Sequence, residues 1–242
     1  MRGMRAALAF LTRLPSGPLD SADFARAPGW FAAVGLVIGA GMAAVWTLAA
    51  LLWSPLIAAL ITVAAGLLLT GALHEDGLAD TFDGLGSGRP RERALEIMRD
   101  SRIGSYGALA LGLALAARVA CLAALGPVAP VALFAGQGFS RGGMTLMLRA
   151  GPYLRPSGAG TGMTGPLGAT GLALIAALLI AAGTTAWMVG GALIPGLCGL
   201  IAAQALIRLW AINRLGGVTG DILGAAQVLG DLGFLLGVLA WR

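Results

Sequence analysis

The sequence predicts an all-α, polytopic transmembrane bundle of about seven spans that forms a single integral-membrane domain over residues 1–242. Of its 242 residues, 58% are hydrophobic and 11% are charged, whereas a soluble domain has about 25% charged residues. The apolar residues gather into uncharged runs such as Phe31 to Trp53. A helical run of about 20 residues crosses the roughly 30 Å hydrocarbon core.

The elements follow in chain order from these runs. A short basic and apolar stretch, Met4 to Leu14, is too short to span and is expected along or partly in the cytoplasmic leaflet. The predicted spans then cover residues 30–53, 55–73, 104–125, 127–149, 167–189, 191–212 and 223–241. Three longer polar stretches, at 73–103, 149–166 and 213–222, alternate with tight connections. The long connections are therefore expected on one side of the membrane.

The distribution of arginine assigns the sides. All 16 basic residues are Arg, and they cluster before the first span and after the second. Because cytoplasmic loops are enriched in basic residues, we expect a cytoplasmic amino terminus, an external carboxyl terminus and three cytoplasmic polar loops, in a bacterial inner membrane. The same scatter of Arg through a lipid-soluble chain argues against nucleic-acid binding. Association into homo-oligomers is left open.

The most informative segment is HEDGLADTFDG, from His74 to Gly84, which continues the second span as a short acidic helix region. It holds four carboxylates, those of Glu75, Asp76, Asp80 and Asp83. On a helix, Asp76, Asp80 and Asp83 lie on one face, where like charges repel unless a cation neutralises them. A solvated acidic helix end is the simpler alternative, but Lys or Arg would then be interleaved. Hard oxygen donors favour Mg²⁺ bound by these three aspartates.

A general base is expected nearby. His74 is the chain's one histidine and directly precedes the acidic stripe, although a lone histidine is more often structural. Glu75 is turned away from the stripe and is an equal candidate. Asp221 follows three glycines at the start of the last span, where helix capping alone could explain it. The choice among His74, Glu75 and Asp221 stays open.

Arginines near these acids are candidate phosphate ligands. Arg99 and Arg102 end a short surface helix whose mixed charges are explained equally well by solvation. Arg155 belongs to a Gly-rich and Pro-rich loop, Arg149 to Gly162, of a type that exposes backbone amides to anions.

Three charges fall inside apolar spans: Arg118, Arg141 and Asp231. Intramembrane charges face the bundle interior, where they pair or contribute to function. Arg141 and Asp231 are expected near the cytoplasmic half and so near the site, with Arg141 a further phosphate ligand. Arg118 is expected deeper, as a structural partner.

The segment from Leu73 to Gly107, which contains HEDGLADTFDGLGSGRPRERALEIMRDSRIGSYG, resembles the signature region of the cobalamin synthase (adenosylcobinamide-GDP ribazoletransferase) family. AFLTRLP (Ala9 to Pro15), RPSGAGTGM (Arg155 to Met163) and GGVTGDILGA (Gly216 to Ala225) resemble further family segments in the same order. The resemblance therefore covers nearly the whole chain. One departure is Asp231, where family members usually have Glu.

The resemblance implies the last assembly step of coenzyme B12 synthesis. A hydroxyl of α-ribazole, or of its 5′-phosphate, attacks the cobinamide-linked phosphorus of adenosylcobinamide-GDP and releases GMP. Mg²⁺ is the cofactor that the family implies, and the bilayer is the second partner. Two alternatives remain: a Mg²⁺-dependent phosphotransferase of the CDP-alcohol type, whose DG…AR pattern is missing here, and a membrane transporter that uses the intramembrane charges as its pathway.

Overall fold

The computed structural model describes residues 2–155 and 162–241. The helices are α1 (Arg2–Leu11), α2 (Ser21–Ala25), α3 (Phe31–Ala50), α4 (Pro55–Thr70), α5 (Leu73–Gly86), α6 (Arg91–Ile97), α7 (Ser105–Leu125), α8 (Ala129–Arg149), α9 (Thr170–Val189), α10 (Leu193–Leu215) and α11 (Gly220–Ala240), with 3₁₀ turns η1 (Ala27–Trp30), η2 (Gly126–Val128) and η3 (Gly190–Ala192). Within these residues the β-structure is one isolated bridge, between Tyr153 and Val218. The predicted all-α class is confirmed for the described chain.

Four helical stretches of the described residues are long and apolar enough to cross a membrane: Ala27–Ala50, Ser105–Arg149, Thr170–Leu215 and Gly220–Ala240. The pair α4 and α5 passes the same test when it is counted as one bent span, which gives five. The two longest stretches, of 45 and 46 residues, each contain two helices around a 3₁₀ turn. A multi-pass helical membrane protein is supported, whereas length and hydropathy do not establish a count of seven.

The helices present apolar side chains outward. Leu113 on α7 is 71% exposed, Leu172 on α9 is 73% exposed and Trp187 on α9 is 88% exposed. Water would disfavour so many large apolar groups at the surface, but lipid chains would not. The outer faces of these helices are therefore suited to contact with hydrocarbon.

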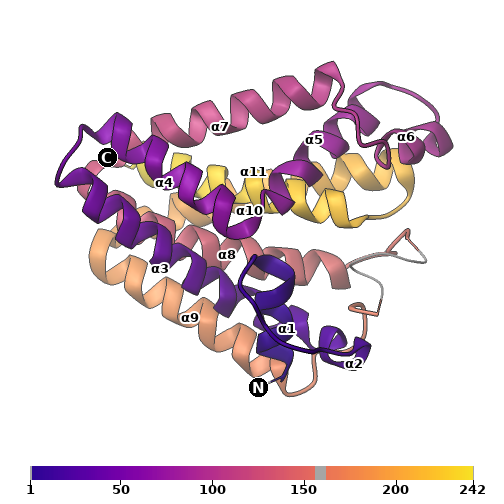
Figure 1. Cartoon of the computed structure of the whole chain (residues 1–242), viewed down its shortest axis with the longest axis horizontal. Helices are drawn as coiled ribbons and strands as arrows, with labels where there is room; N and C mark the ends of the chain where they lie inside the picture. Colours follow the sequence, from indigo (N-terminus) through magenta and orange to yellow (C-terminus); the bar gives the residue numbers. More distant parts are fainter. Residues whose placement is uncertain (1, 156–161, 242) are drawn as a thin grey trace.

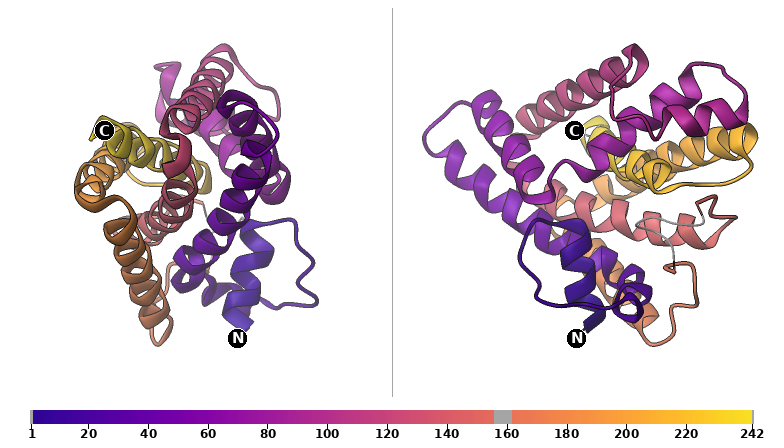
Figure 2. Two further views of the ribbon diagram at one scale, coloured as in Figure 1. Left: turned by 90° about the vertical axis from the view of Figure 1, so that its left-hand side faces the viewer. Right: turned by 45° about the vertical axis from the view of Figure 1, so that its right-hand side comes forward.

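The connections segregate along the bundle (Figure 1). The tight α3–α4 turn and the carboxyl terminus lie at one end, and α5 and α6 lie at the other, as the alternation of loop lengths predicts. Figure 2 shows α1 and α2 beside the beginning of α3. Ala6, Ala7 and Leu11 of α1 are fully buried, and α1 packs on η1 and α3. One face of this amphipathic helix is thus covered by protein.

A sharp bend separates the acidic helix from the apolar one before it. The axes of α4 and α5 differ by 90°. Two successive residues in left-handed conformation make the turn, Gly71 with φ 65° and Ala72 with φ 56°. Glycine adopts this conformation without steric cost, whereas a Cβ makes it unfavourable by about 1–2 kcal/mol at Ala72. The predicted helix over the acidic motif is confirmed, but it does not continue in the direction of α4.

Helix α11 forms the centre of the bundle, where it packs on α5, α7, α8 and α10. Its contact with α10 depends on glycine, because a Cβ on Gly233 would overlap the carbonyl oxygen of Gly199. The contact between α3 and α8 is similar, since a Cβ on Gly39 would lie 2.7 Å from the Leu133 oxygen. Close packing through small residues is typical of membrane helices, and Gly35 and Gly39 both allow α3 to approach the backbone of α8.

The α10–α11 contact gives a stability prediction. Gly233→Ala should destabilise the protein by about 1–3 kcal/mol, the usual range for overpacking. Gly112→Ala is the control, because a Cβ on this exposed helical glycine meets nothing within 4 Å. Thermal unfolding in detergent measures both variants. Equal midpoints for the two would contradict the close contact.

Candidate active site

Helix α5 sends three consecutive side chains in different directions. A helical residue is rotated by about 100° from its predecessor, so His74, Glu75 and Asp76 cannot share a face. His74 and Glu75 are buried, with exposed fractions of 2% and 6%, whereas Asp76 is exposed. The acidic motif therefore serves the protein interior and a surface cavity at the same time.

Glu75 is part of a buried ionic network. Arg118 of α7 lies 3.5 Å from the Glu75 Oε1 atom and 2.9 Å from the Asp231 Oδ2 atom of α11. All three side chains are at most 8% exposed. The predicted structural role of Arg118 is confirmed, and Glu75 and Asp231 are its partners.

Arg141 is not brought to the site with the other predicted arginines. Its guanidinium is 1% exposed and donates to the Gln137 side chain one helical turn away. It shares a buried void of about 10 Å³ with Glu75 and Arg118. Arg141 is therefore a second cation beside the buried network. It does not line the polar cavity described below, so its position does not support the predicted contact with phosphate.

Asp83 binds the amino terminus of α7. Its two carboxylate oxygens accept hydrogen bonds from the backbone amides of Gly104, at 2.7 Å, and Gly107, at 2.8 Å. Amides at a helix amino terminus have no partner within the helix, and the helix dipole favours an anion there. The third aspartate of the predicted metal stripe thus has a structural explanation. Among the described residues, no group of three or more His, Cys, Asp or Glu side chains is placed to hold a metal.

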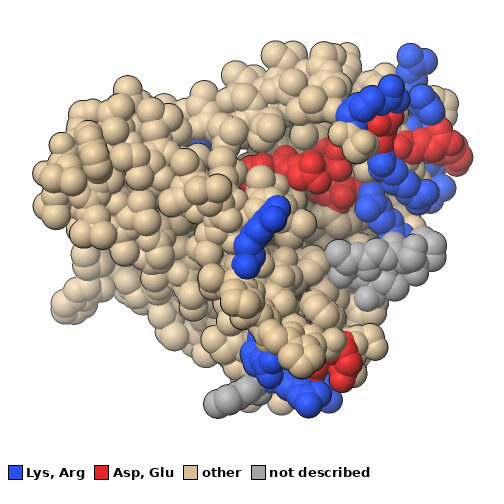
Figure 3. Space-filling view, viewed as in Figure 1, with Lys and Arg blue, Asp and Glu red and all other residues tan. Residues whose placement is uncertain are grey.

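The other two aspartates of the stripe face a large cavity, here called the outer cavity, with a volume of about 790 Å³. Its charged lining comprises Glu75, Asp76, Asp80, Arg99, Asp100, Arg102, Arg155 and Asp221. Figure 3 shows acidic side chains gathered in a hollow of this face, with arginines beside them. Segments from α5, the α6–α7 connection, the α8–α9 loop and α11 meet there, so most of the predicted site residues are brought together.

Arg155 and Asp221 form an ion pair across this cavity, with 2.6 Å between Nη2 and Oδ2. The isolated bridge between Tyr153 and Val218 aligns the two segments that carry them. Capping does not account for Asp221, because the Thr219 hydroxyl accepts from the Ile222 amide and is the N-cap of α11. The anion cradle predicted for the loop after Arg155 falls on residues 156–161, which lie outside the described residues.

At the rim of the outer cavity, Arg102 is paired with Asp100. Its Nη2 atom lies 2.6 Å from Asp100 Oδ2. Hydrogen bonds from the Arg102 side chain and amide lower the pKa of Asp100 to about 2. Asp100 therefore stays charged at neutral pH and holds Arg102 at the rim, whereas Arg99 lies beside it on the cavity wall.

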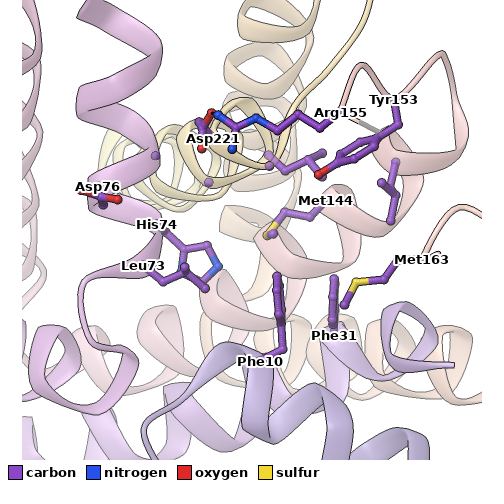
Figure 4. A pocket seen from close by; sticks show the side chains of 15 residues that line it. Phe10, Phe31, Leu73, His74, Asp76, Met144, Tyr153, Arg155, Met163 and Asp221 are labelled. Carbon is purple, nitrogen blue, oxygen red and sulfur yellow. Dashed lines mark hydrogen bonds and ion pairs between the residues drawn. The ribbon is translucent and has the colours of Figure 1, made fainter. Parts of the chain in front are cut away.

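A second, smaller cavity of about 110 Å³, here called the inner cavity, adjoins the outer one. Leu73, Asp76, Arg155 and Asp221 line both. Figure 4 shows that Phe10, Phe31, Met144, Met163 and His74 surround the inner cavity. Sequence reasoning missed the aromatic and methionine residues, although Phe10 and Met163 lie within segments that carry the family resemblance.

Comparison with known proteins decides the family. Residues 3–239 match the family model described as cobalamin-5-phosphate synthase. The chain belongs to the cobalamin-5-phosphate synthase family. Two relatives named adenosylcobinamide-GDP ribazoletransferase are 40% and 43% identical to it, from Bradyrhizobium diazoefficiens (99% of this chain, 94% of the relative) and Azorhizobium caulinodans (98% and 94%). A third, from Vibrio cholerae, is 40% identical over 97% of this chain and 92% of the relative.

No solved structure matches this member of the cobalamin-5-phosphate synthase family. Its site is therefore described from its own geometry. The four segments that carry the resemblance to the family, at Ala9–Pro15, Leu73–Gly107, Arg155–Met163 and Gly216–Ala225, all contribute described residues to the two cavities. Sequence similarity and spatial assembly thus identify the same region.

The buried network gives a second stability prediction. Arg118→Met should leave Glu75 and Asp231 buried without their counter-charge and destabilise the protein by about 3–5 kcal/mol. Arg93→Met is the control, because Arg93 forms an exposed pair with Glu96 that is worth about 1 kcal/mol or less. Unfolding midpoints in detergent compare the two. A loss in Arg118→Met no larger than that in Arg93→Met would show that the network does not hold the helices.

Proposed function

We propose that this chain transfers the adenosylcobinamide phosphate group from adenosylcobinamide-GDP to α-ribazole, or to its 5′-phosphate. A ribazole hydroxyl oxygen forms a bond to the cobinamide-linked phosphorus, the bond from that phosphorus to the bridging diphosphate oxygen breaks, and GMP leaves. The observation that carries the proposal is the meeting of two cavities at Asp76, Arg155 and Asp221. A transfer between two large substrates needs such a junction, and the names of the relatives supply the substrates.

The arginines of the outer cavity suit the diphosphate. Arg155 lies at the junction, and Arg99 and Arg102 lie along the wall. Guanidinium groups bind phosphate oxygens through paired hydrogen bonds. Fixed donors around the reacting phosphorus orient it and offset the negative charge that develops during transfer. Arg155 is partly buried, so its charge is less screened by water than those of Arg99 and Arg102.

The acidic residues fit Mg²⁺. Asp76 and Asp80 lie one turn apart on α5 and both face the outer cavity. Mg²⁺ is usually bound by one or two carboxylates together with water and substrate phosphates, so two aspartates are a sufficient protein contribution. Asp83 supports the site through α7 instead. When bound, Mg²⁺ neutralises charge on the departing GMP phosphate.

The proton of the attacking hydroxyl needs an acceptor. Of the three candidates, Glu75 lines the outer cavity but is buried and held by Arg118, whereas His74 and Asp221 line the inner cavity. Asp221 also lines the outer cavity, so it lies where the two substrates meet. We assign it the role of general base, with Arg155 fixing its orientation through their ion pair.

The direct test uses the purified protein with both substrates. Adenosylcobinamide-GDP, α-ribazole and Mg²⁺ should give adenosylcobalamin and GMP in equal amounts. EDTA should abolish product formation, and added Mg²⁺ should restore it. Folded protein that releases no GMP but moves a corrinoid into vesicles would replace the enzyme proposal with that of a transporter.

Asparagine variants test the metal proposal. Asp76→Asn and Asp80→Asn keep the side-chain volume but remove a charge, so each should lower kcat by about 100-fold or more and raise the Mg²⁺ concentration for half-maximal rate. Asp83→Asn should also lower the midpoint of thermal unfolding, because it weakens the hydrogen bonds that Asp83 accepts from the backbone amides of α7. Glu92→Ala is the control, since the Glu92 side chain is 77% exposed. Unchanged Mg²⁺ dependence in the first two variants would contradict the assignment.

The topology is part of the same proposal. Helices α3, α4, α7, α8 and α9 fall within predicted spans, and α10 and α11 overlap the last two, which were predicted at 191–212 and 223–241. The Arg asymmetry supports a site at the cytoplasmic face of a bacterial inner membrane. A reporter fused after Gly86, at the end of α5, should behave as cytoplasmic, and one fused after Ala240 as external. A reporter at Gly86 that behaves as external would contradict the placement of the site.

A further inference from the structure

The inner cavity has an apolar body that the phosphate chemistry does not use. Its walls are formed by Phe10, Phe31, Met144, Leu148, Met163 and Leu223. The rings of Phe10 and Phe31 are stacked, with centroids 5.6 Å apart and planes within 7° of parallel. Flat aromatic faces and polarisable methionine side chains are suited to a planar ring system.

Two polar side chains also line this apolar body, those of His74 and Tyr153. The His74 side chain, which is 2% exposed, points toward Met144 and Phe10 in Figure 4. Its Nε2 atom has no hydrogen-bond partner among the described residues. A buried polar atom without a partner is unfavourable by about 1–3 kcal/mol, so a ligand that hydrogen-bonds to this ring would offset that cost.

The polar end of the cavity lies at the junction. Asp76, Arg155 and Asp221 stand where the inner cavity meets the outer one. A ligand with an aromatic part in the inner cavity therefore presents its polar part to the groups that were assigned to phosphate binding and proton transfer. The two cavities also differ in volume, at about 110 Å³ for the inner one and about 790 Å³ for the outer one. They are therefore suited to substrate parts of different size.

We propose that the inner cavity binds the benzimidazole base of the ribazole nucleoside, with its ribose at the junction, and that the corrinoid diphosphate occupies the outer cavity. This assignment rests on the proposed function. A corrin macrocycle is several times larger than a two-ring base, so it does not fit the inner cavity. Guanine is small enough, but its edge carries several donors and acceptors that the apolar walls would leave unpaired. A benzimidazole nucleoside has one free ring nitrogen, which can accept a hydrogen bond from the unpartnered His74 Nε2.

A cavity-filling variant tests the assignment. Met144→Trp should raise KM for α-ribazole at least about tenfold while KM for adenosylcobinamide-GDP changes less than about twofold. Met144→Leu is the control, because it keeps the volume and the apolar character of the wall. A rise in KM for adenosylcobinamide-GDP instead, or an equal rise for both substrates, would overturn the assignment.

A substrate analogue tests the hydrogen bond in the unaltered protein. The matching indole nucleoside has the same shape as α-ribazole but a C–H in place of the accepting ring nitrogen. The wild-type protein should prefer α-ribazole by about tenfold or more in kcat/KM, and His74→Leu should remove that preference. Equal kcat/KM for the two nucleosides in the wild type would overturn the assignment even if Met144→Trp did not fold. Absence of any product from α-ribazole with the wild type would instead refute the proposed function.

Discussion

The structure depends on placing charge inside an apolar bundle. Arg118 carries a guanidinium into the middle of α7, where it lies against Glu75 of α5 and Asp231 of α11. Buried charges are tolerated when they are paired, and loss of one partner leaves the others strongly unfavourable. Arg141 shares a void with Glu75 and Arg118, so the buried region contains two cations and two carboxylates. The pairing therefore fixes how α5 and α7 sit on the central helix α11.

That constraint orients the acidic motif. Because Glu75 is held by Arg118, the helical rotation turns His74 into the inner cavity and Asp76 toward the junction. Asp83 secures the far end of the same helix to α7 through two backbone amides. Two carboxylates of this short helix, those of Glu75 and Asp83, are structural anchors. The other two, those of Asp76 and Asp80, face the outer cavity. The sharp bend at Gly71 and Ala72 makes this possible, because it sends α5 across the end of the bundle.

The site is completed by segments far apart in the chain. Arg155 and Asp221 are separated by 66 positions and meet in one ion pair. Phe10 reaches the same region from α1, where its ring stacks on Phe31 of α3. The local sequence around these four residues does not predict the contacts between them. The Arg155–Asp221 pair forms where the α8–α9 loop and the segment before α11 are aligned by the bridge between Tyr153 and Val218, and the Phe10–Phe31 stack forms where α1 packs on α3.

The sequence by itself determined the helical membrane class, the positions of the long helices and the polar segments that form the site, because hydropathy and helical spacing are local properties. Charge and motif also pointed to Asp76 and Asp80 as metal ligands and to Arg155 as a phosphate ligand, and the structure brings all three to the outer cavity. The tertiary structure decided which charges are structural. Asp83 and Arg141 have the same residue types as site residues, and only the position of α7 and the burial of α8 distinguish them. The apolar inner cavity also needed the fold, since Phe and Met in a membrane protein carry no local signal that separates a binding wall from ordinary packing.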